Sequence, residues 1–99
     1  MEAKLINRGK EGELKLVGKL NNLTAPDVDE IFDQITGRFD RIILNAEDLV
    51  YISSAGLRVI KRAHLTMKDK GGSLIIRNLS DSIKELLEMT GMMGVLNVE

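Results

Sequence analysis

Two serines stand at the predicted start of a helix, within the stretch that runs from Asp48 to Arg58. A serine hydroxyl at a helix start lies beside free backbone N–H groups, and such groups can stabilise the charge of a phosphate. Ser54 is therefore the first candidate for phosphorylation and Ser53 the second. The structural alternative is that Ser53 or Ser54 only caps the helix, a role worth about 1 kcal/mol.

Phosphorylation at this position would change binding more than folding. A phosphoserine adds roughly −1.5 to −2 charges near pH 7, and a helix N-terminus tolerates them through its dipole. A docked partner that buried Ser54 would instead meet desolvation and repulsion of several kcal/mol. Because about 1.4 kcal/mol changes affinity tenfold, that penalty abolishes micromolar binding. The pattern thus predicts a switch that leaves the fold nearly unchanged.

The elements that position these serines can be read from hydrophobic periodicity. Strands are expected where apolar residues alternate or run together, at residues 4–8, 13–20, 41–47 and 73–77, with a short last strand at 95–98. Glycines separate these segments, as at the turn 9–12 between the first two strands. Residues 48–52 are expected to be a connecting segment.

Three helices fit between and after the strands. The first starts after an N-cap at Thr24 and ends near Gly37, and the second covers residues 55–70 and stops at a Gly-Gly pair. A third helix, capped by Ser80 and ended by Gly91, turns three apolar residues inward, namely Ile83, Leu86 and Leu87. His64 lies at the edge of the apolar side of the second helix, and we expect it to be packed.

The order β-β-α-β-α-β-α-(β) predicts an α/β fold. Parallel strands joined by right-handed crossovers would form a mixed, mostly parallel sheet of four to five strands with helices packed against it. The length of 99 residues suits one domain, residues 1–99. In such sheets functional residues gather beyond the carboxyl ends of the strands, where Ser53 and Ser54 fall.

Composition excludes several classes of function. The chain has no Cys and a single His, so we expect no thiolate zinc site, no thiol catalysis and no metal centre. A net charge of −1 and three aromatic residues argue against nucleic-acid binding. No apolar run spans a bilayer and the N-terminus has no signal pattern, so we expect a cytoplasmic protein away from membranes.

Charge is distributed unevenly along the chain. Residues 20–50 carry a net charge of −5 and residues 51–78 a net charge of +5. Such runs are commonly solvated helix faces. The alternative is a docking surface on the second helix, because complementary charge speeds encounter with a partner. Leu65 favours docking, since it interrupts the basic face formed by Arg58, Lys61 and Arg62.

At this point the sequence resembles a known family. The segment DLVYISSAGL at residues 48–57 is similar to the signature of STAS domains, specifically bacterial anti-sigma-factor antagonists. The segment GKLNNLTA at residues 18–25 resembles their second motif. Two later landmarks match in order and spacing, GGSL at 71–74 and LLEMTGM at 86–92. The resemblance covers nearly the whole chain and implies a STAS-type single domain.

The resemblance implies a regulatory switch in transcription and no enzyme. In that family the unphosphorylated antagonist binds an anti-sigma factor, which is also a serine kinase of the histidine-kinase-like ATPase fold, and so frees a sigma factor. The kinase phosphorylates the serine aligned with Ser54, and the antagonist is released. A metal-dependent serine phosphatase of the PP2C type reverses the step. ATP and magnesium belong to the kinase, so this chain needs no cofactor, and the family suggests a monomer.

The residues expected to contact the partner lie around the two serines and along the second helix. They are Asn21, Asn22, Thr24, Asp48, Tyr51, Ser53, Ser54, Gly56, Arg58, Lys61, Arg62 and Leu65. Family members often carry Asp where this chain has Ser53 and Asn21, which leaves Ser53 as a second possible acceptor. Two other functions remain open: a STAS scaffold that binds another regulator without phosphorylation, and a small-ligand or nucleotide-binding module.

Overall fold

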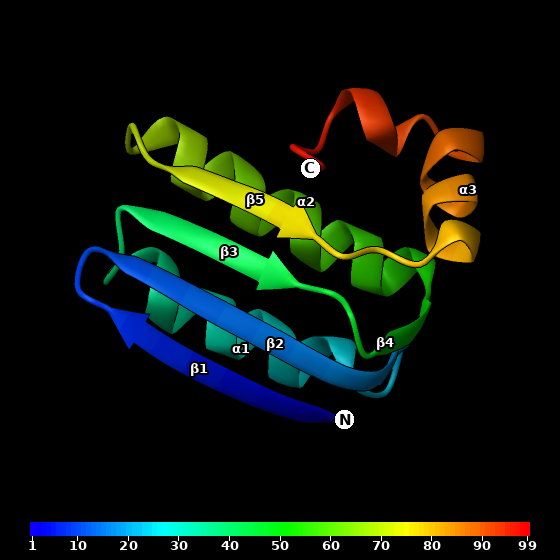
Figure 1. Ribbon diagram of the computed structural model, residues 1–99, viewed down its shortest axis with the longest axis horizontal. Helices are drawn as coiled ribbons and strands as arrows, with labels where there is room; N and C mark the ends of the chain where they lie inside the picture. Colours follow the sequence, from blue (N-terminus) through cyan, green and yellow to red (C-terminus); the bar gives the residue numbers. More distant parts are fainter.

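The computed structural model describes residues 1–99 as a sheet with helices packed on one side (Figure 1). The order of elements is the one expected, with one additional strand and without the last one. The bounds are β1 Glu2–Arg8, β2 Glu11–Leu20, α1 Ala25–Thr36, β3 Arg41–Asn45, β4 Leu49–Ile52, α2 Ser54–Asp69, β5 Ser73–Arg77 and α3 Asp81–Met89, followed by a 3-10 turn at Met92–Gly94.

Strand β2 is the centre of the sheet. It runs antiparallel to β1, pairing Arg8 with Glu11, and parallel to β3, which in turn pairs with β5 in parallel. The far end of β2 pairs instead with β4, after a register shift between Gly18 and Lys19. Gly18 has a φ of +110°, a value that glycine adopts without strain. The predicted mixed, mostly parallel sheet is confirmed and has five strands.

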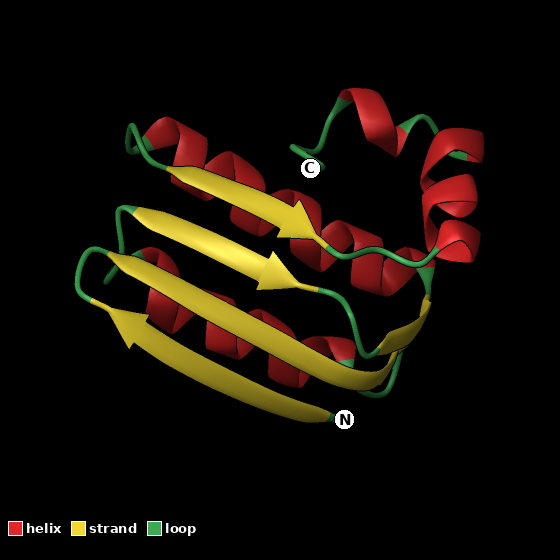
Figure 2. Ribbon diagram, in the orientation of Figure 1, coloured by secondary structure: helices red, strands yellow, loops and turns green.

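The core lies between the sheet and helices α1 and α2, which cover the same face (Figure 2). Strand β2 alternates between the two faces and buries every second side chain against the helices, namely Leu14, Leu16 and Leu20. Helices α1 and α2 both begin at the end of the sheet where β2 and β4 finish, and α3 stands at that same end (Figure 1). The topology therefore brings two helix starts together.

Two sequence-based expectations are wrong. Residues 48–52 are not only a connecting segment, because Leu49–Ile52 forms β4 beside β2. The expected strand at 95–98 does not form, and Val98 makes only an isolated bridge to Ile76. The cause is the 3-10 turn at Met92–Gly94, which leaves only the last residues free to reach β5.

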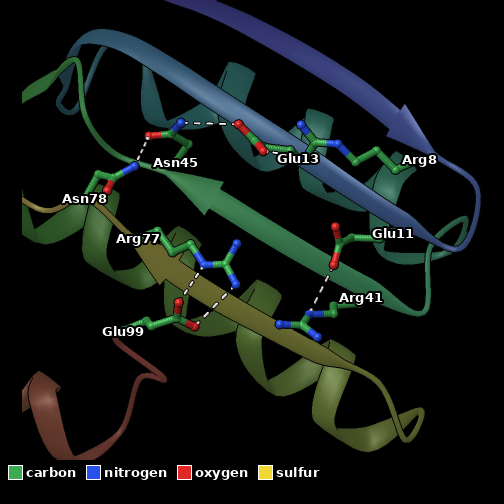
Figure 3. Close-up of polar contacts among 8 residues, drawn as sticks. All are labelled: Arg8, Glu11, Glu13, Arg41, Asn45, Arg77, Asn78 and Glu99. Atoms are coloured by element: carbon green, nitrogen blue, oxygen red, sulfur yellow. Dashed lines mark hydrogen bonds and ion pairs between the residues drawn. The ribbon is translucent and has the colours of Figure 1, made fainter.

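The other face of the sheet is open and carries polar side chains linked to one another (Figure 3). Glu13 accepts from Asn45 at 3.2 Å and from the guanidinium of Arg8. Further ion pairs join Arg41 to Glu11 at 3.3 Å and Arg77 to Glu99 at 2.9 Å. The alternation predicted for β2 is confirmed: one face is dry and the other faces solvent.

Candidate functional site

The first turn of α2 assigns different roles to the two serines. Ser53 is the N-cap, with an extended backbone (ψ 173°), and its Oγ accepts a hydrogen bond from the backbone N–H of Gly56 at 3.2 Å. The backbone N–H of Ser53 donates to the carbonyl of Leu20 at 2.8 Å, which ties the cap to the end of β2. The structural alternative thus holds for Ser53, whose hydroxyl is engaged within the chain.

Ser54 is the first residue of α2 and is exposed. Its hydroxyl makes no hydrogen bond with any other residue of the chain, whereas the neighbouring serine caps the helix. The hydroxyl of Ser54 is therefore accessible to an enzyme, and it stands beside the unpaired backbone N–H groups of the helix start. A phosphate at this position would lie at the positive end of the α2 dipole.

The turn between β2 and α1 lies beside this helix start and is held by Asn21 and Thr24. The hydroxyl of Thr24 donates to the carbonyl of Lys19 at 2.8 Å and accepts from the N–H of Asn21 at 2.9 Å. The Asn21 Oδ1 accepts from the N–H of Leu23 at 2.9 Å. Thr24 occupies the predicted N-cap position of α1, but its side chain makes no cap hydrogen bond. Asn21 and Thr24 hold this turn together.

A groove of about 370 Å³ separates the first turns of α1 and α2. Its walls come from both helices and from the turn before α1, and they include Asn22, Pro26, Ala55, Arg58 and Val59. Its lining contains both apolar and polar side chains. The predicted contact residues Asn22, Arg58 and Arg62 all line this groove.

The uneven charge of the sequence is partly cancelled across the groove. Arg62 of α2 reaches Asp29 and Asp33 of α1, with Nη2–Oδ1 distances of 2.6 Å to each. The hydrogen bond that Arg62 donates to Asp29 is the main reason that the pKa of Arg62 rises above its usual value. Arg62 therefore fastens α2 to α1.

Arg58 and Lys61, by contrast, are exposed and form no ion pair within the chain. They supply unbalanced positive charge on α2, with Arg58 about one turn and Lys61 about two turns from Ser54. The predicted contact residue Asp48 is engaged instead: its Oδ2 lies 3.0 Å from Lys15 Nζ, and this contact raises the pKa of Lys15.

Gly56 is buried where α2 crosses the ends of β2 and β4. A Cβ at this position would lie 2.7 Å from Leu20 Cγ and 3.0 Å from Ile52 Cγ1, so only glycine lets the helix start this close to the sheet. Gly56 therefore lets the start of α2 pack closely on the sheet. It is buried and does not itself reach the surface. Leu65 is exposed but lies about three turns further along α2, away from the serines.

Apolar side chains are exposed around the same end of the sheet. Tyr51, a predicted contact residue, is 49% exposed, and two residues that sequence reasoning missed are more exposed still: Val50 at 65% and Leu23 at 86%. Leu23 follows Asn22 in the turn before α1, and its position between two polar neighbours gave no periodic signal. Exposed apolar residues near an unpaired hydroxyl and free cations are typical of a protein-binding surface.

No group of three or more His, Asp or Glu side chains is arranged to hold a metal ion. No helix has the length and apolar character required to cross a bilayer.

Together, the fold and the site define a class of protein: a small α/β domain that presents a serine hydroxyl and a mixed groove where two helices start. The chain belongs to the STAS domain family, whose model matches residues 5–99. It is 30% identical over 84 residues to BtrV of Bordetella bronchiseptica, named as an anti-sigma factor antagonist, covering 84% of this chain and 72% of BtrV. It is 29% identical over 87 residues to the anti-sigma-B factor antagonist of Staphylococcus aureus, covering 87% and 81%.

Solved structures agree on the fold. The unphosphorylated form of the anti-sigma factor antagonist SpoIIAA superimposes with a TM-score of 0.78 at 16% identity, covering 99% of this chain and 87% of that one. The phosphorylated form of the Bacillus cell fate determinant SpoIIAA gives a TM-score of 0.77 at 17% identity, covering 99% and 91%. The predicted STAS-type α/β fold is therefore confirmed.

Proposed function

We propose that this chain is an anti-sigma factor antagonist whose binding is switched by phosphorylation of Ser54. In its unmodified form it binds an anti-sigma factor through the surface around the α2 start. That partner is a serine kinase of the histidine-kinase-like ATPase fold, and a PP2C-type phosphatase restores the unmodified form. The chain itself catalyses no reaction in this cycle.

One observation carries the proposal: of two adjacent serines, Ser53 is engaged as the helix cap and Ser54 is exposed with a free hydroxyl. A phosphate on Ser54 would break no hydrogen bond of the fold. The relatives named as anti-sigma factor antagonists support the assignment of partner class. The phosphorylated SpoIIAA structure shows that this fold accommodates a phosphate in that protein.

The surface around Ser54 suits a partner that touches it directly. The groove between α1 and α2 is lined by Ala55 and Arg58, which follow Ser54 in α2, and Leu23 is exposed in the turn before α1. A partner seated there would bury Ser54. A phosphate dianion would then be desolvated at the interface, which costs several kcal/mol and weakens binding by two or more orders of magnitude.

The test uses the anti-sigma factor kinases encoded in the same genome as this chain, each incubated with it and Mg-ATP. Intact-mass measurement should show one added phosphate on the natural chain and none on Ser54→Ala. The matched control is Ser53→Asp, which removes the other hydroxyl, keeps a good N-cap and restores the residue common in the family. It should still accept one phosphate.

Two results would contradict the proposal. Phosphate on Ser54→Ala would place the acceptor elsewhere. A kinase that binds the natural chain tightly without modifying it would instead support the scaffold function, in which the STAS domain binds a regulator and is not switched.

A further inference from the structure

Strand β1 leaves one edge of the sheet uncovered. It pairs with β2 along its whole length, and no strand pairs with its other side (Figure 1). All seven of its residues are exposed, and they include Leu5 at 40% and Ile6 at 43%. An edge of this length presents a row of free backbone N–H and C=O groups, which can pair with another strand.

We propose that two copies of this chain associate through antiparallel pairing of β1 with β1, with Leu5 opposite Leu5 on a two-fold axis. The pairing continues the sheet from one copy into the next. A two-fold axis perpendicular to the strands closes the assembly at two copies. The inference does not depend on the proposed function, because β1 lies on the opposite side of β2 from β3 and does not include the α2 start.

The residue pattern of β1 explains why the partner is a second copy. The pairing with β2 puts Glu2, Lys4, Ile6 and Arg8 on the open face and Leu5 on the helix side. Directly opposite residues of two antiparallel strands lie on the same face, with Cβ atoms about 4.5–5.5 Å apart. Only pairings that are symmetric about one residue are compatible with a two-fold axis.

Three such registers keep most of the strand paired. They differ in which charged side chains lie opposite each other. A register centred on Lys4 puts the two Lys4 side chains opposite each other, and one centred on Ile6 puts Lys4 opposite Arg8 twice. Both bring like charges together, which is destabilising.

The register centred on Leu5 has no such conflict. It puts Glu2 opposite Arg8 at both ends, Lys4 opposite Ile6, and the two Leu5 side chains against each other. Arg8 already bonds Glu13 of its own chain, but a guanidinium has five N–H donors and can hold a second carboxylate. The strand is therefore complementary to itself in one register.

The contact is small, so association is weak. Seven residues from each copy form a contact at the low end of interface sizes, where complexes are transient. The family-based expectation of a monomer then describes dilute protein, and paired copies appear as concentration rises. Lys4 limits the pairing to one register, as charges on edge strands commonly do.

Cysteine cross-linking reads the register directly, because the natural chain contains no Cys. The variants Leu5→Cys and Ile6→Cys each place a thiol on the axis of one register, within the reach of a disulfide. Lys68→Cys, at an exposed position on α2, is the matched control for random collision. Thiols held together have a millimolar effective concentration, so at protein concentrations where a large share of the chains is paired we expect Leu5→Cys to dimerise severalfold faster than the control. Ile6→Cys should match the control, because this variant keeps Lys4 opposite Arg8 in the register centred on residue 6.

Sedimentation of the cysteine-free chain supplies the second readout. The mean mass of the natural chain should rise with concentration, whereas Glu2→Arg should stay monomeric because it places an arginine opposite Arg8 twice. Rapid cross-linking of Ile6→Cys, or a Leu5→Cys rate no higher than that of Lys68→Cys, would overturn the proposal. So would equal self-association of Glu2→Arg and the natural chain.

Discussion

The open face of the sheet and the surface around Ser54 carry similar polar side chains, yet they use them differently. On the open face, Glu13 is bonded by Arg8 and Asn45, Arg41 pairs with Glu11, and Arg77 pairs with Glu99 (Figure 3). Around Ser54, the serine hydroxyl, Arg58 and Lys61 have no partner within the chain.

This difference separates groups that stabilise the fold from groups that are available to another molecule. Within the site the same distinction holds: Arg62 is bonded to Asp29 and Asp33, and Ser53 caps α2. The predicted contact residues therefore divide into two sets. The side chains of one set bond within the chain, and those of the other are free to contact another molecule. Substitution of one residue at a time distinguishes the two sets.

The largest effect is expected at Gly56, which supports the site from beneath. In Gly56→Val the new side chain would overlap Leu20 and Ile52, and overpacking of this kind costs about 1–3 kcal/mol. Urea unfolding should show this loss of stability. The matched control is Gly94→Val, where no atom lies within 4 Å of an added Cβ. Equal stability of both variants would contradict the packing role of Gly56.

The two serines should differ in what they contribute to stability. Ser53→Ala removes the cap of α2 and should lower the free energy of unfolding by about 1 kcal/mol. Ser54→Ala removes a hydroxyl without a partner and should change it by less than about 0.5 kcal/mol. Urea midpoints measure both. The reverse order would show that Ser54, and not Ser53, holds the helix start.

Arg58 should affect a phosphate on Ser54 because it lies one turn further along α2, where i and i+4 side chains meet. A nearby cation favours the dianion, so the second pKa of phosphoserine, about 6, should rise by about 0.3–0.5 unit in Arg58→Gln. Lys61→Gln is the control, since about 10 Å of helix separates Lys61 from Ser54 and salt screens that distance. Phosphorus NMR titration of protein with phosphoserine encoded at 54 measures the shift. An equal shift in both variants would contradict a local pairing.

The smallest effect is expected on the open face. The hydrogen bonds from Arg8 and Asn45 hold the pKa of Glu13 below its usual value. A depressed pKa adds stability above the unfolded pKa of about 4.3, and this stability is lost as the pH falls through the folded value. Glu13→Gln should thus lower the melting temperature slightly at pH 7 and less below pH 4. Glu30→Gln, at an exposed position without an ion pair, should show no such pH dependence.

Sequence reasoning captured the elements with a clear periodic signal. The strand at 73–77 has the bounds predicted from its apolar run, and the glycines and caps located both long helices. It missed β4, because the four residues Leu49–Ile52 are buried only at their two ends and show no alternation. The sequence also does not show that β4 pairs with β2, because this pairing depends on the register shift at Gly18.

The site was predicted in position but not in detail. Ser53 and Ser54 are equally good caps by residue type, and only the extended backbone of Ser53 shows which of them caps α2. The ion pairs of Arg62 join residues 33 and 29 positions apart, so no local pattern indicates them. The turn residues Asn21 and Thr24 were identified by motif, and their bonds to each other and to Lys19 appear only in three dimensions.

A phosphate on Ser54 should leave the stability of the fold nearly unchanged and prevent the partner from binding. The direct test encodes phosphoserine at position 54 and measures melting temperature and affinity for the anti-sigma factor kinase on the same protein. We predict a melting temperature within about 2 °C of the natural chain and an affinity at least about 100-fold weaker. Unchanged affinity, or a melting temperature lowered by ten degrees or so with affinity lost through unfolding, would contradict the account.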